Sequence, residues 1–216
     1  MKNQRLAVSI QGETFMENLS EILISTYPKA ISLEDKTPVT IRPLLKTDEA
    51  ALLEYFRSLP PEDRLCLKED VTDPQVIENW IYELDYDSIL PLIALHNGNI
   101  VGDATLHFNP IGWTRHQAEV RLTTSTRFRV RGLGTILLQN LIDIATQLGL
   151  EQISIEIPPV LDKAFYLFEK MGFKEVAKLQ GFVKDLEGNE SDLVLMVKYL
   201  KEVAVDTGKG QRAGAA

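Results

Sequence analysis

Cysteine is almost absent from this chain, since Cys66 is the only one among 216 residues. A single cysteine excludes an internal disulfide and provides no metal-ligand spacing. Because Cys66 stands between Leu65 and Leu67, we expect it to be a small buried apolar residue. The sequence also lacks an apolar run long enough to cross a membrane, and the apolar patch after residues 1–5 is too short for a secretory signal. These absences predict a cytoplasmic protein without a metal site.

Basic residues are outnumbered by acidic ones. The chain has 23 Lys and Arg against 31 Asp and Glu, which gives a formal net charge of −8. This balance argues against general binding to nucleic acid and is compatible with an amine-bearing or basic protein substrate. The hydrophobic content of 44% is ordinary for a globular protein, and the length suffices for one well-buried domain with extensions.

Hydrophobic periodicity and turn signals divide the chain into strands and helices. Apolar residues at helical spacing over residues 13–26 predict an amphipathic helix ahead of the main domain. Asp73-Pro74 predicts a helix start, and Asn97-Gly98 predicts a tight hairpin turn. We expect further helices from Thr47, between residues 135 and 149, and over 161–171, and strands over 30–33, 39–43, 90–96, 100–108, 117–124, 152–157, 176–184 and 193–198.

This order of elements predicts a mixed α/β (α+β) fold, in which one twisted, mostly antiparallel sheet has helices on both faces. We expect an N-terminal helix and hairpin extension over residues 1–36, a main domain over residues 37–202 and a disordered tail over residues 203–216. The extension would pack on the sheet or form a contact in a homodimer.

A basic loop with two glycines, Arg129-Val130-Arg131-Gly132-Leu133-Gly134-Thr135, lies between an expected strand and an expected helix. Glycines let the backbone approach a ligand closely, and the first N–H groups and the dipole of a helix favour an anion. The loop therefore predicts a phosphate site. It lacks the Gly-Lys-Ser/Thr of a Walker loop, and Leu137 stands where the dinucleotide fingerprint needs a third glycine. Both of these nucleotide loops are excluded.

The segment Arg129-x-x-Gly132-x-Gly134 resembles the Arg/Gln-x-x-Gly-x-Gly/Ala signature of the GCN5-related N-acetyltransferase (GNAT) family. Three further segments resemble this family in the same order. They are residues 39–44 with the helix that follows, the hairpin at 97–102, and residues 164–173, which are similar to Ala-x-x-Leu-Tyr-x-Lys-x-Gly-Phe. The resemblance covers roughly residues 38–200. It implies the GNAT fold, with acetyl-CoA as the acyl donor and no metal.

The resemblance also implies which residues contact acetyl-CoA. Backbone amides of the loop would bind the pyrophosphate, and the end of the preceding strand would pair with the pantetheine as with an added strand. Phe168 occupies the position of the family's usual tyrosine acid, four residues before Gly172-Phe173, and has no proton to give. The expected contacts are Leu122, Thr123, Thr124, Arg129, Val130, Arg131, Gly132, Leu133, Gly134, Thr135 and Phe168.

Acyl transfer to an amine needs a group that accepts the proton of the amine. Glu119 is our candidate for this base. It stands thirteen residues before Gly132, and certain bacterial and archaeal protein-lysine acetyltransferases of the family place a glutamate at that spacing. The segment that starts at Asp48 also resembles the start of those domains. His116 and His107 are second candidates close to Glu119.

We therefore expect an enzyme that moves an acetyl group from acetyl-CoA to a primary amine by direct attack, without a covalent enzyme intermediate. A protein lysine is the leading acceptor, and a small polyamine or amino sugar is the alternative acceptor. A non-catalytic acyl-CoA sensor is the alternative from another class of protein. Phe168 favours the sensor, and Glu119 opposes it.

Overall fold

The computed structural model describes residues 2–64, 67–159, 161–185 and 187–201. Cys66 and the tail predicted after residue 202 lie outside these residues. The strands are β1 (Lys29–Ser32), β2 (Pro38–Pro43), β3 (Ile89–His96), β4 (Asn99–Phe108), β5 (Gln117–Thr124), β6 (Gln152–Ile157), β7 (Lys174–Lys184) and β8 (Glu190–Tyr199). The helices are α1 (Lys2–Thr26), α2 (Glu49–Ser58), α3 (Pro61–Arg64), α4 (Pro74–Tyr82), α5 (Leu133–Gln147) and α6 (Asp162–Lys170), with 3-10 helices η1 (Lys46–Asp48) and η2 (Thr126–Arg131).

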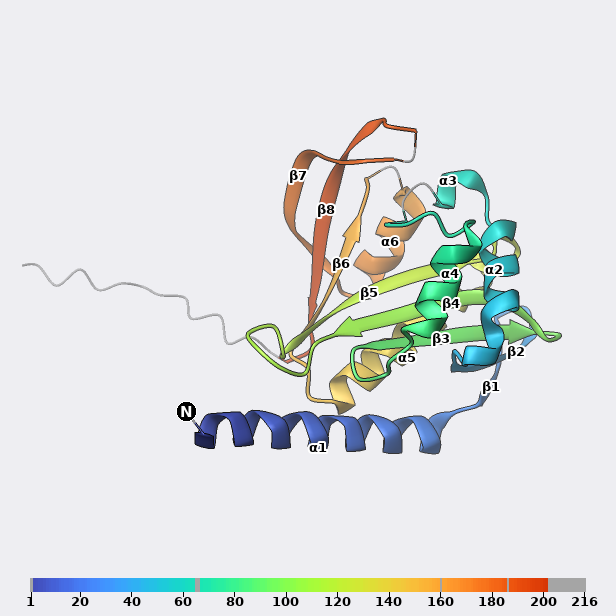
Figure 1. Cartoon of the computed structure of the whole chain (residues 1–216). Coiled ribbons are helices and arrows are strands. Elements are labelled where there is room, and N and C mark those ends of the chain that lie inside the picture. Colours follow the sequence, from blue (N-terminus) through green and yellow to red (C-terminus); the bar gives the residue numbers. More distant parts are fainter. Residues whose placement is uncertain (1, 65–66, 160, 186, 202–216) are drawn as a thin grey trace, which may run out of the picture.

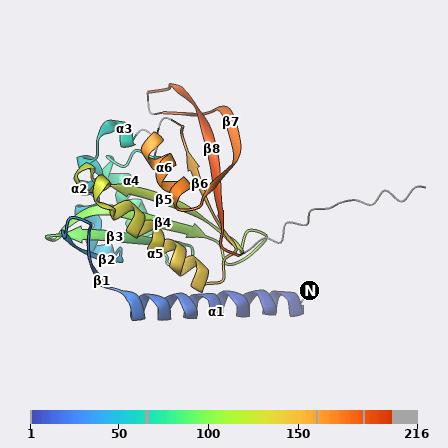
Figure 2. The same ribbon diagram turned by 180° about the vertical axis from the view of Figure 1, so that it is seen from behind.

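Within the described residues, the strands form one 8-stranded sheet in the order β1-β2-β3-β4-β5-β6-β8-β7. Neighbouring strands are antiparallel, except that β5 and β6 are parallel. Helices α2 and α4 cover one face of the sheet, and α5 and α6 cover the other (Figures 1 and 2). The predicted mixed, mostly antiparallel sheet with helices on both faces is therefore confirmed.

Each face of the sheet buries its own apolar cluster, because successive side chains of a strand point to opposite faces. Leu92 of β3 packs in the cluster that contains Leu137 of α5, whereas its neighbour Ile93 packs in the cluster that contains Phe56 of α2. Full burial of one such side chain contributes about 1.5–3 kcal/mol. The two clusters together fix the sheet between its helical layers.

Helix α1 is longer than predicted, since it runs from Lys2 and not from residue 13. No proline interrupts this stretch of sequence. Leu19 is buried, and the ring of Phe15 lies 5.2 Å from the ring of Phe108 on β4. The strand β1 that follows pairs with β2 and is the first strand of the sheet. The domain boundary near residue 36 and the homodimer remain predictions.

Strands β5 and β6 pair over a short distance only. Their parallel ladder joins Gln117–Glu119 to Gln152–Ser154. Beyond this point β5 continues beside β4 and β6 continues beside β8, so the two strands diverge (Figure 1). Among the described residues, Val120–Thr124 of β5 has no ladder partner on the side of β6. We call these residues the free edge of β5, and we call the Glu119–Ser154 pair the divergence point.

Candidate active site

The predicted phosphate loop follows the free edge of β5 directly. Its first part is η2, and helix α5 begins at Leu133. Gly132 joins the two with a φ of 84°, a left-handed conformation that glycine adopts readily. The first N–H groups of α5 have no partner within the helix, and the positive end of the helix dipole lies at the same place. This arrangement of strand end, turn and helix N-terminus fits the pyrophosphate of a coenzyme A donor.

Carboxylates hold both arginines of the loop. Arg129 forms an ion pair with Asp63 of α3, and its Nε donates to the carbonyl oxygen of Thr124 at 3.3 Å. The Nη1 of Arg131 lies 3.0 Å from Oδ2 of Asp35 in the turn between β1 and β2. The two guanidinium groups therefore brace the loop against α3 and the β1–β2 turn. Because carboxylates already pair with their charges, these two arginines add less positive potential to an anion site than two unpaired arginines would.

The β1–β2 turn also borders the glycine of the loop. The Glu34 N–H donates to the carbonyl oxygen of Arg131 at 3.4 Å. Oε1 of Glu34 lies 3.2 Å from the position that a Cβ on Gly132 would occupy. Hydrogen bonds from Thr37, together with the charge of Arg131, keep the pKa of Asp35 below its usual value. Sequence reasoning predicted the hairpin but missed the contact of its acidic turn with the phosphate loop, because contacts between segments so distant in the chain leave no local signal.

The remaining predicted loop residues differ in exposure. Val130 is exposed, Thr135 is half-buried and Leu133 is buried. Gly134 is also buried, and a Cβ on it would lie 3.3 Å from Cδ2 of Leu167. The small residue at this position lets α6 approach the start of α5 closely.

The free edge of β5 carries the residues predicted to contact pantetheine. Leu122, Thr123 and Thr124 are all half-buried. Leu122 packs against the cluster on the α5 face, whereas Oγ1 of Thr123 lies 2.9 Å from the hydroxyl of Tyr55 on the α2 face. Because the edge lacks a strand on one side, its backbone can pair with an extended amide-bearing ligand.

Glu119 lies at the divergence point within a cluster of charges. Nζ of Lys68 lies 2.9 Å from Oε1 of Glu119 and 2.9 Å from Oε2 of Glu156 on β6. Nε of Arg121 donates to Oε1 of Glu119 at 3.2 Å. Burial of the Glu119 carboxyl would raise its pKa, but the hydrogen bonds and charges of Lys68 and Arg121 outweigh burial and hold the pKa below its usual value. Glu119 is therefore a carboxylate at neutral pH.

A row of polar side chains on β4 faces the same side of the sheet as Glu119. The antiparallel register puts His107 opposite Glu119 and Asp103 opposite Thr123. Burial, with a smaller contribution from the charge of Arg121, lowers the pKa of His107 to about 4. Burial raises the pKa of Asp103 to about 7. His107 thus lies beside Glu119 as a neutral imidazole, and Asp103 is a buried acid that sequence reasoning missed.

His116, the other histidine candidate near Glu119, has a structural contact through its backbone. The carbonyl oxygen of His116 accepts a hydrogen bond from the amide of Glu151 at 2.7 Å, which ties the β4–β5 loop to the start of β6. Trp113 in the same loop is 89% exposed.

The aromatic residues of α6 occupy different environments. Phe168, at the position of the family's usual acid, is only 2% exposed and packs edge-to-face on Phe173 at 5.3 Å. Tyr166 is largely exposed. The buried position of Phe168 fits a phenylalanine, because a tyrosine hydroxyl there would need a hydrogen-bond partner.

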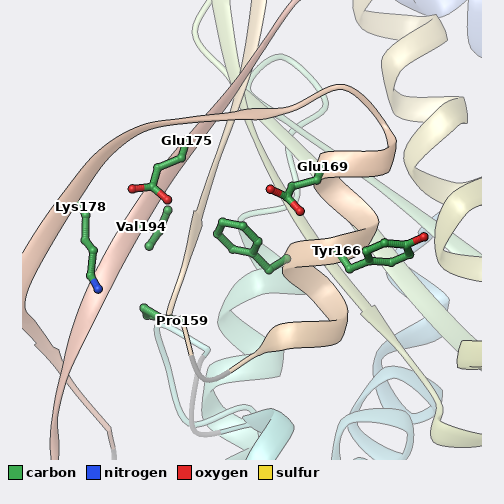
Figure 3. A pocket seen from close by; sticks show the side chains of 7 residues that line it. Pro159, Tyr166, Glu169, Glu175, Lys178 and Val194 are labelled. Carbon is green, nitrogen blue, oxygen red and sulfur yellow. The ribbon is translucent and has the colours of Figure 1, made fainter.

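A separate cavity of about 310 Å³ lies between α6 and β7 (Figure 3). Glu169 of α6 and Glu175 of β7 line opposite walls, and Tyr166 points away from Lys178. Neither Glu119 nor the phosphate loop lines this cavity. It is therefore distinct from the free edge of β5.

Residues 2–64, 67–159, 161–185 and 187–201 contain no group of three His, Cys, Asp or Glu side chains that could hold a metal ion. The same residues contain no helix long and apolar enough to span a membrane.

Comparisons with known proteins agree with this fold. The sequence model of the acetyltransferase (GNAT) family matches residues 50–173. A search of curated proteins gave no match. Among solved structures, the ribosomal-protein-S5-alanine acetyltransferase of Vibrio fischeri has a TM-score of 0.69 at 14% identity, and the match covers 81% of this chain and 98% of that chain.

Two further solved structures have the same fold. The ribosomal-protein-alanine N-acetyltransferase of Brucella melitensis has a TM-score of 0.63 at 25% identity, over 74% of this chain and 98% of that chain. A putative acetyltransferase from Salmonella typhimurium, solved with its cofactor acetyl-CoA, has a TM-score of 0.64 at 23% identity, over 77% of this chain and 96% of that chain. With the family match over more than half of its length, the chain belongs to the GNAT family and is an acetyl-CoA-dependent acyltransferase.

Proposed function

We propose that this enzyme transfers the acetyl group of acetyl-CoA to the primary amine of a protein lysine, with Glu119 as the general base. The observation that carries the proposal is the position of Glu119 at the divergence point, beside the free edge of β5. A donor that pairs with the free edge would bring its thioester to the carboxylate that can take a proton from the acceptor.

Acetyl-CoA would bind mainly through backbone groups. The amides of residues 130–135 would contact the pyrophosphate. Leu122, Thr123 and Thr124 would line the pantetheine, whose amides would pair with the backbone groups that point out from the free edge. The left-handed Gly132 and the unpaired edge support this assignment. Arg129 and Arg131 would act chiefly by keeping the loop in shape, since Asp63 and Asp35 already neutralise them.

Glu119 would accept the proton of the attacking ammonium. A lysine amine titrates near about 10.4, so at neutral pH it must lose a proton on or before attack. The lowered pKa keeps Glu119 ionised and ready to accept a hydrogen bond, although it also weakens the carboxylate as a base. Direct attack forms the amide N–C bond and breaks the thioester C–S bond. The leaving thiolate would take its proton from water, because Phe168 has none to give.

The assignment of a protein lysine as the acceptor rests on the spacing between Glu119 and Gly132 and on the net negative charge of this chain, which suits a basic substrate. Structural neighbours named for the acetylation of ribosomal-protein alanine make the α-amine of a protein the main competing acceptor. A non-catalytic acyl-CoA-binding module is the competing function, and the buried Phe168 is the feature that favours it.

The test is thiol release from acetyl-CoA with a panel of acceptors. The panel contains lysine peptides with a blocked N-terminus, alanine-start peptides without lysine, a polyamine and an amino sugar. We expect the blocked lysine peptides to react fastest. Glu119→Gln should lower kcat/KM by about 10²–10⁴-fold and leave the Kd for acetyl-CoA unchanged.

Glu156→Gln is the matched control, because Glu156 is the other carboxylate bound to Lys68 but belongs to β6, across the diverging strands from the free edge of β5. This variant should keep kcat/KM within a few-fold. An active Glu119→Gln would contradict the assignment of the base. Binding of acetyl-CoA without transfer to any acceptor would favour the non-catalytic module.

A further inference from the structure

Lys68 is an amine of the chain itself that lies at the proposed centre of chemistry. It comes from the segment between α3 and α4, and its Nζ bridges Glu119 on β5 and Glu156 on β6. These two strands are the ones that separate beyond the divergence point. Lys68 therefore spans the diverging strands on the face that carries the polar row of β4.

The contact between Lys68 and Glu119 meets the requirement that an acceptor amine lie within reach of the base. A general base must lie within hydrogen-bond reach of the proton it removes, and the Nζ to Oε1 distance is 2.9 Å. The Lys68 side chain is 47% exposed, so it is not locked into the core. Burial would lower its pKa, but the hydrogen bonds to Glu119 and Glu156 outweigh burial and raise it. Lys68 thus starts as an ammonium whose proton points at a carboxylate.

We propose that Lys68 is an internal acyl acceptor, which the enzyme acetylates within the same molecule. The inference rests on the proposed function, since it uses the same donor site and the same base. The Lys68 ammonium would give one proton to Glu119, its nitrogen would form a bond to the acyl carbon, and the C–S bond of acetyl-CoA would break. The second proton that the nitrogen loses would pass through water to the thiolate. The products are an acetyl-lysine, coenzyme A, and a proton that Glu119 returns to solvent.

The modification would change the site that produced it. The amide nitrogen of acetyl-lysine carries no charge, so the ion pairs of Lys68 with Glu119 and Glu156 would be lost. Glu119 would keep Arg121 as its cationic partner. Acetylation would therefore remove the internal amine that competes for Glu119 and leave the carboxylate available to an external acceptor.

The test follows acetylation of the full-length chain with acetyl-CoA and no added acceptor, by peptide mass spectrometry over time. Lys178 is the matched internal control, because its side chain is 49% exposed and pairs with Asp192 at 3.0 Å, but on β7. Uncatalysed acetylation would label the two lysines alike. We expect Lys68 to be acetylated at least about tenfold faster than Lys178, because it is held next to the reacting atoms. The rate per molecule should not depend on protein concentration.

Two variants sharpen the test. Lys68→Arg keeps a cation between Glu119 and Glu156 but cannot be acetylated in this way, so the label at this position should vanish while acetyl-CoA still binds. Glu119→Gln should reduce the labelling of Lys68 to the rate of Lys178.

Equal rates at Lys68 and Lys178 in the unmodified chain would overturn the inference. If peptides are acetylated while Lys68 is not, the inference fails and the proposed function stands. If acetyl-CoA binds but neither peptides nor Lys68 are acetylated, both fail together.

Discussion

Asp103 offers a test of how the face of the sheet that carries Glu119 is organised. Its carboxyl is buried on β4, and the hydroxyl of Thr105 donates to it at 3.3 Å. Burial raises the pKa from 3.8 in its ordinary state to about 7. Since each tenfold change in proton affinity corresponds to about 1.4 kcal/mol, this difference amounts to about 4 kcal/mol at most. Asp103→Asn replaces the titrating group by a neutral one of similar shape.

The sign of the pH effect follows from proton binding. Because the folded state holds the Asp103 proton more tightly than the unfolded state, the stability that this proton provides is complete below pH 3.8 and is lost as the pH rises through about 7. Relative to Asp103→Asn, the natural chain should therefore lose about 3–4 kcal/mol of unfolding free energy between about pH 4 and about pH 8.

Urea unfolding followed by circular dichroism at a series of pH values measures this difference. His107 has a lowered pKa and so contributes with the opposite sign, but it is present in both chains and cancels in the comparison. Parallel pH profiles for the two chains would refute the argument, because they would mean that Asp103 titrates alike in the folded and unfolded states.

Two further predictions concern glycines. Gly132→Ala should weaken acetyl-CoA binding at least about tenfold in calorimetry, because a side chain at a φ of 84° costs about 1–3 kcal/mol and would shift the loop. Gly134→Ala is the control, and its Kd for acetyl-CoA should stay within about threefold of that of the unmodified chain. Position 134 has helical backbone angles, and the nearest neighbour of the new Cβ would be the flexible side chain of Leu167 at 3.3 Å. Equal losses of affinity in the two variants would contradict the role of Gly132. Gly102→Ala should lower the unfolding free energy in urea by about 1–3 kcal/mol, because its Cβ would lie 2.9 Å from Cδ1 of Leu137. Unchanged stability would contradict tight packing between β4 and α5.

Local signals in the sequence predicted most of the helices and strands and their order along the chain, although they missed α3 and the first half of α1. The cap at Asp73 accepts from the Gln75 amide at 2.9 Å, and the turn at Asn97-Gly98 has positive φ at both residues, as such motifs require. The divergence of β5 and β6 could not be derived in this way, because no local pattern in either strand states where its pairing ends.

Contacts between distant segments could not be predicted in this way. Lys68 reaches Glu119 across 51 positions, and Arg129 pairs with Asp63 across 66. A lysine or an aspartate in a polar segment resembles an ordinary solvated residue until the fold brings its partner close. Asp103 was missed for a related reason, since an acid within an apolar strand does not reveal whether it is buried.

The free edge of β5 also bears on how the protein avoids aggregation. Unpaired strand edges at the rim of a sheet invite pairing with other chains, and proteins usually block them with charges, prolines or bulges. Here the unpaired backbone lies in the middle of the sheet, and the ladder between β5 and β6 closes its far end. A strand from another protein would have to fit its side chains and its neighbouring strands into the space between β5 and β6. A slender, single-chain ligand meets no such obstacle, so the same edge is open to the donor and closed to self-association.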